Sequence, residues 1–70
     1  MNIQKVFSCN LRKYRTTLGL SQEAFAEKCG MHRTYISALE CQQRSIALSN
    51  IQKIADALGI ETYKLFMEEK

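Results

Sequence analysis

The chain has 70 residues, a length that fits one small domain with a single hydrophobic core. Apolar residues make up 46% of it, which favours a folded chain over a disordered one. Its three cysteines form no closely spaced pair, and an odd number argues against a secreted disulfide scaffold. No apolar run is long enough to span a membrane, and the N-terminus lacks the apolar region of a signal peptide. We therefore expect a single cytoplasmic domain over residues 1–70, without membrane association.

The net charge of +3 is unevenly distributed along the chain. Residues 1–22 carry basic side chains and no acidic one: Lys5, Arg12, Lys13 and Arg15. Residues 49–70, in contrast, have a net charge of −1. This asymmetry favours an anionic partner that approaches from one side, although an ordinary solvated surface explains the charge distribution equally well.

The first predicted helix ends before Gly19. Its apolar residues recur at helical spacing and form one broad stripe, made of Ile3, Val6, Phe7, Leu11, Tyr14 and Leu18. Cys9 and Arg12 lie away from this stripe, whereas Arg15 lies at its edge. The helix is therefore expected to bury one side against the rest of the domain.

The second predicted helix spans about residues 22–29. Ser21 is a favourable N-cap, and Leu20 and Phe25 occupy the two positions of a hydrophobic staple. Gly30 is suited to the left-handed residue that ends a helix. This helix is therefore short, with a defined residue at each end.

Three further helices complete the predicted all-α fold of five short helices. The third spans about residues 33–41 and is anchored by Ile36 and Leu39, and the last covers about residues 61–66. The fourth stops at Gly59 and has one apolar stripe: Leu48, Ile51, Ile54, Ala55 and Leu58. Residues 22–41, two short helices joined by a Gly-containing turn, predict a helix-turn-helix; a simple packed helical hairpin is the alternative.

The third helix has a side that faces away from its two apolar anchors. At about 100° per residue, that side carries Arg33, Thr34, Ser37 and Ala38. An Arg can donate two hydrogen bonds to guanine, Thr and Ser can donate or accept, and a small Ala lets a helix approach the base edges. A merely solvated surface usually carries Lys and Glu instead, so this side favours base reading in the DNA major groove.

The sequence gives little support for a metal site or for enzymatic activity. Cys9, Cys29, His32 and Cys41 lack the two close ligand pairs of a zinc site, and Cys29 fits better as a small core residue. The chain has one His, no Gly-rich phosphate loop and too little length to enclose a substrate pocket. We therefore expect no metal, no cofactor and no enzymatic activity.

The stretch "RTTLGLSQEAFAEKCGMHRTYISALE" resembles the Cro/repressor-type helix-turn-helix family, and the likeness continues through "NIQKIADALGI" to "LF". More narrowly, "HRTYIS" followed by "RSIALSNIQKIA" resembles the controller proteins of restriction–modification systems. This resemblance implies a lambda-repressor-like fold. It also implies a cytoplasmic, nucleoid-associated regulator that acts on its own promoter and on that of the endonuclease.

The resemblance further implies roles for individual residues. It supports the four base-reading positions and assigns DNA-backbone contacts to Gln22, Tyr35, Arg44, Ser45 and Asn50. It also implies a buried ion pair between Arg15 and Glu40, in agreement with the position of each at the edge of an apolar stripe. The sequence departs from the family pattern at His32 and Ala47, where a capping residue is usual, and at Cys41 and Gln42.

The expected partners are double-stranded DNA and a second copy of the chain, with RNA polymerase as a further candidate. One monomer offers too few base contacts for tight binding, so we expect a homodimer on a palindromic operator. Candidate dimer residues lie in the C-terminal half: Ile60, Tyr63 and Phe66. They could equally only close the core. A phage-type repressor, or an antitoxin whose main partner is another protein, is the alternative function.

Overall fold

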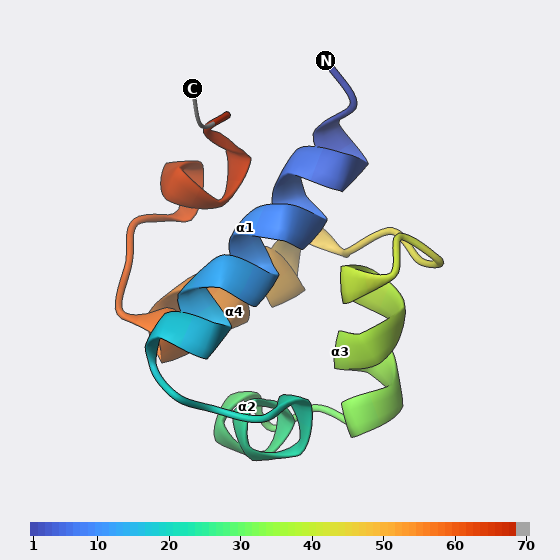
Figure 1. The fold of residues 1–70 in the computed structure, drawn as a ribbon. Coiled ribbons are helices and arrows are strands. Elements are labelled where there is room, and N and C mark those ends of the chain that lie inside the picture. Colours follow the sequence, from blue (N-terminus) through green and yellow to red (C-terminus); the bar gives the residue numbers. More distant parts are fainter. Residues whose placement is uncertain (69–70) are drawn as a thin grey trace.

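The structure, a computed structural model, describes residues 1–68. It contains α1 (Ile3–Thr17), α2 (Gln22–Cys29), α3 (Arg33–Glu40), α4 (Leu48–Leu58) and the 3-10 helix η1 (Thr62–Phe66) (Figure 1). Within residues 1–68 there is no β-strand, so the predicted all-α class is confirmed. No helix in this part of the chain is long and apolar enough to cross a membrane.

The fifth predicted helix forms, but as a 3-10 helix rather than an α-helix. Its five residues are too few for a stable ladder of α-helical hydrogen bonds, and the Lys64 N–H bonds instead to the Glu61 carbonyl three residues earlier, at 3.1 Å. The segment is nevertheless firmly attached. The buried amide of Asn10 on α1 donates to the carbonyls of Leu65 and Met67, each at 2.9 Å.

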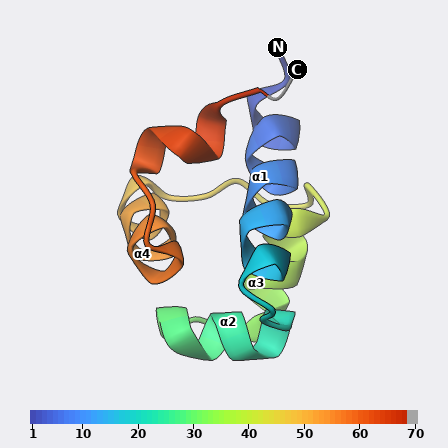
Figure 2. The same cartoon turned by 60° about the vertical axis from the view of Figure 1, so that its left-hand side comes forward.

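The five elements form a closed ring around one core. α1 contacts α3 and η1, α2 contacts α3 and α4, and α4 contacts η1. Figure 2 shows α2 across one end of the molecule, with α4 and η1 together on the side away from α3. Every element contributes to the buried core, which consists of Phe7, Leu11, Phe25, Ala26, Ile36, Leu39, Ile54, Ala55, Leu58 and Leu65.

Both ends of α2 follow local rules, whereas the starts of α3 and α4 do not. The hydroxyl of Ser21 accepts the Ala24 N–H at 3.0 Å, and Gly30 ends α2 in the left-handed conformation with φ of 71°. His32 and Ala47, in contrast, precede α3 and α4 without any capping hydrogen bond from a side chain. The departures noted in the sequence therefore leave two helix starts uncapped.

Candidate nucleic-acid interface

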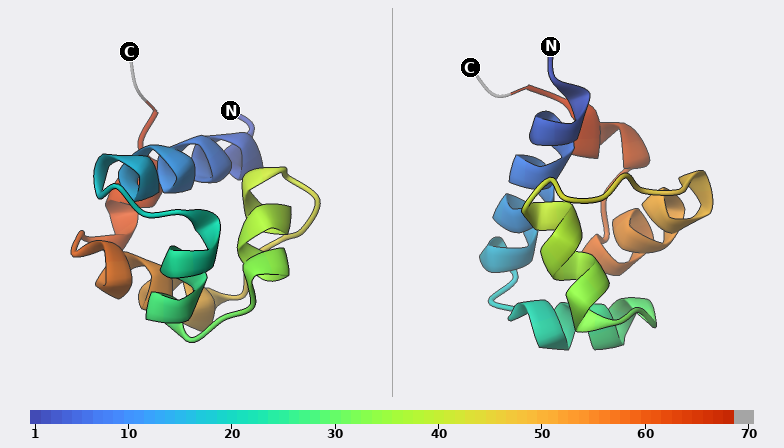
Figure 3. Two further views of the ribbon diagram at one scale, coloured as in Figure 1. Left: turned by 60° about the horizontal axis from the view of Figure 1, so that its bottom comes forward. Right: turned by 90° about the vertical axis from the view of Figure 1, so that its right-hand side faces the viewer.

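The first two residues of α3 face solvent while its apolar anchors are buried. Arg33 and Thr34 are exposed, whereas Ile36 and Leu39 are only 0% and 1% exposed. Figure 3 (right) shows α3 facing the viewer, next to α2. The predicted division of this helix into a buried side and an outward side is therefore present, and the outward side is widest at the start of the helix.

Ser37 and Ala38 are half-buried, so the exposed side of α3 narrows toward its C-terminal end. The reason is that α1 packs against this end. The Ser8 hydroxyl on α1 lies 2.6 Å from the carbonyl oxygen of Leu39 and 2.8 Å from that of Gln4, and its single proton can serve one of them at a time. Ser8 is only 1% exposed, and no pattern in the sequence indicated that this position holds α3.

The Arg15 guanidinium and the Glu40 carboxylate form the predicted ion pair. Arg15 Nε lies 2.7 Å from Glu40 Oε2, and Nη2 lies 2.9 Å from Oε1, which makes the pair bidentate. Their side chains are 9% and 4% exposed, and Arg15 Nη1 also donates to the Leu20 carbonyl at 2.7 Å. The hydrogen bonds with Glu40 raise the pKa of Arg15 above its ordinary value. One side chain of α1 thus connects the end of α3 with the segment that leads into α2.

Gln22, a predicted DNA-backbone contact, lies beside this ion pair. Its Nε2 donates to Glu40 Oε1 at 3.1 Å, and the side chain is half-buried at the start of α2. An amide nitrogen carries two protons, so one N–H remains for an acceptor outside the protein. The structure therefore links this residue to the buried carboxylate, which the sequence pattern did not suggest.

Three other predicted backbone contacts come together at the opposite end of α3. The guanidinium carbon of Arg44 lies 5.0 Å from the centre of the Tyr35 ring, and Asn50 Nδ2 donates to the Tyr35 hydroxyl at 3.0 Å. These side chains belong to a shallow hollow lined by Met31, His32, Thr34, Tyr35, Arg44 and Asn50. An exposed base-reading candidate and three backbone-contact candidates thus share one surface.

The loop between α3 and α4 carries Ser45, the remaining backbone-contact candidate. Ser45 is exposed and follows Arg44, whose carbonyl accepts a hydrogen bond from Gln4 Nε2 at 3.1 Å. Within the loop, Gln42 has a positive φ of 62° and so helps to reverse the chain, at one of the positions where the sequence departs from the family pattern. The loop is therefore attached to α1, while Ser45 stays accessible.

Two basic side chains of α1 lie away from α3, whereas Arg15 pairs with Glu40 at the C-terminal end of that helix. Lys5 and Lys13 line a groove between α1 and the C-terminal segment, together with Met67, and no residue of α3 lines that groove. The uneven charge along the sequence therefore does not by itself locate the surface around α3. Two cations belong to this surface: Arg33, which is exposed at the start of α3, and Arg44, which lines the same hollow as Thr34.

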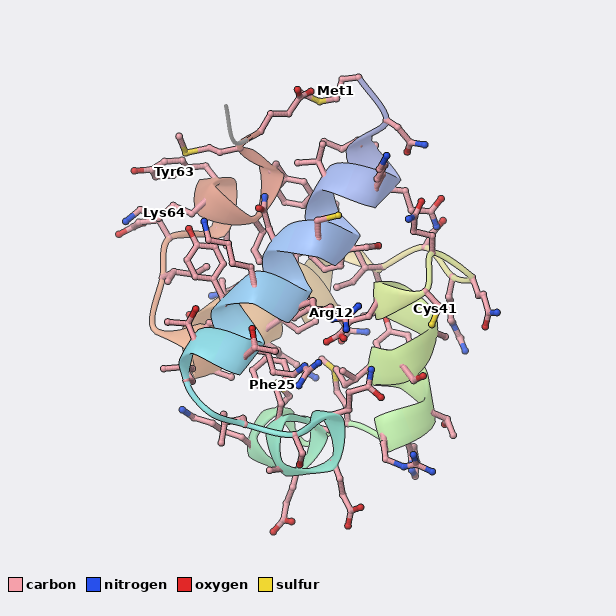
Figure 4. The ribbon with its side chains drawn as sticks, in the orientation of Figure 1. Met1, Arg12, Phe25, Cys41, Tyr63 and Lys64 are labelled. Carbon is pink, nitrogen blue, oxygen red and sulfur yellow. The ribbon has the colours of Figure 1, made fainter. Side chains whose placement is uncertain are left out.

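The three dimer candidates differ in exposure. Tyr63 is 60% exposed and its side chain extends away from the body of the molecule (Figure 4). Ile60 is half-buried, and Phe66 stacks on Phe7 with ring centres 5.6 Å apart. Leu48, at the start of α4, is 85% exposed and was not singled out from the sequence, where it counted as part of the buried stripe. Of these apolar side chains, Tyr63 and Leu48 are the most accessible.

The cysteines occupy three different environments. Cys29 at the end of α2 is half-buried against the core, as predicted, and this burial raises the pKa of its thiol to about 11. The thiol is therefore protonated near neutral pH. Cys9 and Cys41 are exposed, and Cys41 lies just after the end of α3 (Figure 4).

The helix-turn-helix family HTH_3 matches residues 11–65, which include the whole of α2, α3 and α4. A hypothetical transcription factor of Neisseria meningitidis is 46% identical over 66 residues, which cover 94% of this chain and 62% of the relative. Control protein C.SmaI of Serratia marcescens is 39% identical over 69 residues, covering 99% of this chain and 82% of the relative.

A solved structure is also similar to this chain in both fold and sequence. The crystal structure of the restriction–modification controller protein C.AhdI from Aeromonas hydrophila superimposes with a TM-score of 0.86 at 44% identity. The superposition covers 90% of this chain and 96% of that one.

Proposed function

We propose, because this chain belongs to the helix-turn-helix family HTH_3, that it is a sequence-specific DNA-binding regulator of transcription. The observation that carries the proposal is the exposure of the first two residues of α3, Arg33 and Thr34, on a helix whose anchors Ile36 and Leu39 are buried. A helix held in this way can enter the major groove with its N-terminal residues against the base edges.

Base reading is assigned to the outward side of α3. Arg33 would donate two hydrogen bonds to the O6 and N7 atoms of a guanine, and the methyl group of Thr34 would contact a thymine. Ser37 and Ala38 are half-buried and would contribute mainly by letting the helix approach closely. Arg33 is therefore the main determinant of sequence preference in the proposal.

Contacts with the DNA backbone are assigned to residues on both sides of α3. Gln22 would donate its remaining N–H to one phosphate, and Ser45 would donate its hydroxyl near the centre of the operator. Tyr35, Arg44 and Asn50 form the second backbone-contact surface, at the hollow beside the start of α3. Such contacts would orient the helix without reading sequence.

The regulator is proposed to act as a homodimer on a palindromic operator. A two-fold axis would place the two copies of α3 about 34 Å apart, one turn of DNA. The exposed Leu48 and Tyr63, together with the less exposed Ile60 and Phe66, are the proposed apolar contact, since α4 and η1 lie on the same side of the molecule (Figure 2). Dimerisation would make DNA binding rise steeply with protein concentration.

The similarity to C.SmaI and C.AhdI supports a controller role in a restriction–modification system. In that role the protein would regulate its own gene and that of the endonuclease, and could contact RNA polymerase at the promoter. These events would take place at the nucleoid in the cytoplasm.

Footprinting of the purified protein on the DNA upstream of its own gene tests the proposal. We expect protection of a palindrome with half-sites one helical turn apart, and affinity that falls steeply with salt. Affinity for a scrambled duplex of the same length should be much lower. Equal affinity for both duplexes would contradict sequence-specific regulation, and a stable complex with a co-encoded protein in place of DNA binding would favour the antitoxin function.

A further inference from the structure

Three side chains from separate segments form one cluster at the hollow beside α3. Tyr35 comes from α3, Arg44 from the following loop and Asn50 from the first turn of α4. Arg44 lies against the Tyr35 ring, and Asn50 Nδ2 donates to the Tyr35 hydroxyl at 3.0 Å. The loop is itself attached to α1 through the bond from Gln4 to the Arg44 carbonyl. The phenol is therefore held from two sides before any ligand binds.

The direction of the hydrogen bond from Asn50 decides what the Tyr35 hydroxyl can do. A phenol oxygen has one proton to donate and can also accept. When it accepts the Asn50 N–H, its own proton remains available and points to a different partner. The Tyr35 hydroxyl is then a donor toward the hollow, which suits an anionic oxygen such as that of a phosphodiester.

We infer that Asn50 is a positioning residue that acts on the DNA backbone through Tyr35, and not chiefly as a phosphate contact of its own. By donating to the phenol, Asn50 fixes the position of the ring and keeps the Tyr35 hydroxyl as an outward donor. The inference rests on the proposed function, because it specifies how one backbone contact is made. It also explains why a half-buried amide at the start of α4 is directed at the recognition helix.

A double-mutant cycle tests the inference on the duplex that footprinting identifies. Tyr35→Phe removes the hydroxyl and Asn50→Ala removes the donor, and each should weaken binding roughly 10-fold or more, since a hydrogen bond to a charged group is lost. The double variant should bind no more weakly than Tyr35→Phe alone. If the two losses multiply instead, Asn50 makes an independent contact and the inference is wrong. Ser49→Ala, at the exposed neighbouring position, is the matched control and should bind like wild type.

Asn50→Asp sharpens the test because it retains the shape of the side chain. A carboxylate can only accept, so the Tyr35 hydroxyl would donate inward and lose its outward role. The added negative charge also weakens DNA binding, and this effect is present in the wild type and in a Tyr35→Phe background alike. The reorientation of the hydroxyl, in contrast, cannot occur in the Tyr35→Phe background, because the hydroxyl is absent there. The loss caused by Asn50→Asp should therefore be smaller in that background than in the wild type. An equal loss in both backgrounds would overturn the inference.

Duplexes with a neutral methylphosphonate at single positions locate the contact. Tyr35→Phe and Asn50→Ala should each lose sensitivity at the same phosphate, while Gln22→Ala loses it at another. Loss at a different phosphate for Asn50→Ala would show a direct contact and refute the inference. If the wild-type protein protects no DNA, it is the proposed function that fails. The variants at Tyr35 and Asn50 should unfold at temperatures close to that of the wild type, so that a change in binding is not a change in folding.

Discussion

The two ends of α3 differ in how the rest of the protein holds them. At the C-terminal end, Glu40 accepts hydrogen bonds from Arg15 and Gln22, and the Ser8 hydroxyl lies within hydrogen-bond distance of the Leu39 carbonyl. At the N-terminal end, no side chain caps the helix, and its first two residues are exposed. An eight-residue helix is not stable alone, so it needs attachment to the body. Attachment at the C-terminal end allows Arg33 and Thr34, at the other end, to stay exposed and available to DNA.

The two ends also differ in the kind of polar group that they display. The C-terminal end contains a buried, bidentate ion pair whose atoms are turned toward one another. The surface beside the N-terminal end contains Arg44, Tyr35 and Asn50, which contact one another but still border an open hollow. The hydrogen-bonding groups of a buried ion pair are occupied by each other, so the pair fixes the position of the helix end. The groups that border the hollow keep hydrogen-bond donors available for a ligand. Substitutions at the first end should therefore change stability, and those at the second should change binding.

Glu40→Ala tests the attached end and should have the largest effect. It leaves the Arg15 guanidinium buried without its carboxylate, which should lower the free energy of unfolding by about 3–5 kcal/mol. Urea denaturation followed by circular dichroism measures this loss. Glu27→Ala, at an exposed glutamate of α2, should change stability by less than about 0.5 kcal/mol. An unchanged melting temperature for Glu40→Ala would show that the pair does not hold α3.

Arg33→Ala tests the free end. It should weaken operator binding by about 1–3 kcal/mol per half-site and relax the preference at one base pair, with no loss of stability. Binding to a set of operators with single base changes measures both effects. Gln22→Ala is the contrasting control, because a backbone contact should weaken binding to all these operators alike. If Arg33→Ala lowers affinity uniformly, Arg33 is not a base-reading residue.

Ser8→Ala tests the second attachment of the C-terminal end. The Leu39 carbonyl still accepts the Gln42 N–H at 3.2 Å, so it does not become unsatisfied, and the expected loss is about 1 kcal/mol. Denaturant unfolding again gives the value. Thr17→Ala removes an exposed hydroxyl that donates to the Lys13 carbonyl and should have almost no effect. If the two substitutions lower the free energy of unfolding equally, the hydrogen bond between Ser8 on α1 and Leu39 on α3 does not contribute to stability beyond an exposed hydroxyl.

His32→Ser tests whether the N-terminal end of α3 is uncapped because of its sequence. The backbone at His32, with φ of −78° and ψ of 143°, is close to that of Ser21, so a serine there can cap the helix. We expect a gain of about 0.5–1 kcal/mol in the free energy of unfolding. Ser21→Ala should produce a loss of similar size, and calorimetry of both variants completes the comparison. If His32→Ser does not raise the free energy of unfolding, the missing cap is not what limits the stability of the start of α3.

Local rules were sufficient for the helices themselves. Ser21 and Gly30 define the bounds of α2 through capping and a left-handed residue, and these depend on the nearest few residues only. Helical periodicity likewise placed Ile36 and Leu39 on the buried side of α3. It failed for Leu48, because a stripe calculated for an isolated helix does not reveal that the helix start extends beyond the core.

The sequence by itself determined the all-α class, the positions of the helices and the division of α3 into two sides, since each follows from the period of the helix and from residues adjacent in the chain. Apart from the Arg15–Glu40 pair, which the family resemblance implied, the tertiary structure alone decided which distant partners the polar side chains have. Asn10 meets residues 54 to 57 positions later, Ser8 meets Leu39, and Tyr35 meets Asn50. Such contacts join segments that are far apart in the chain, and they depend on how the whole ring of helices closes.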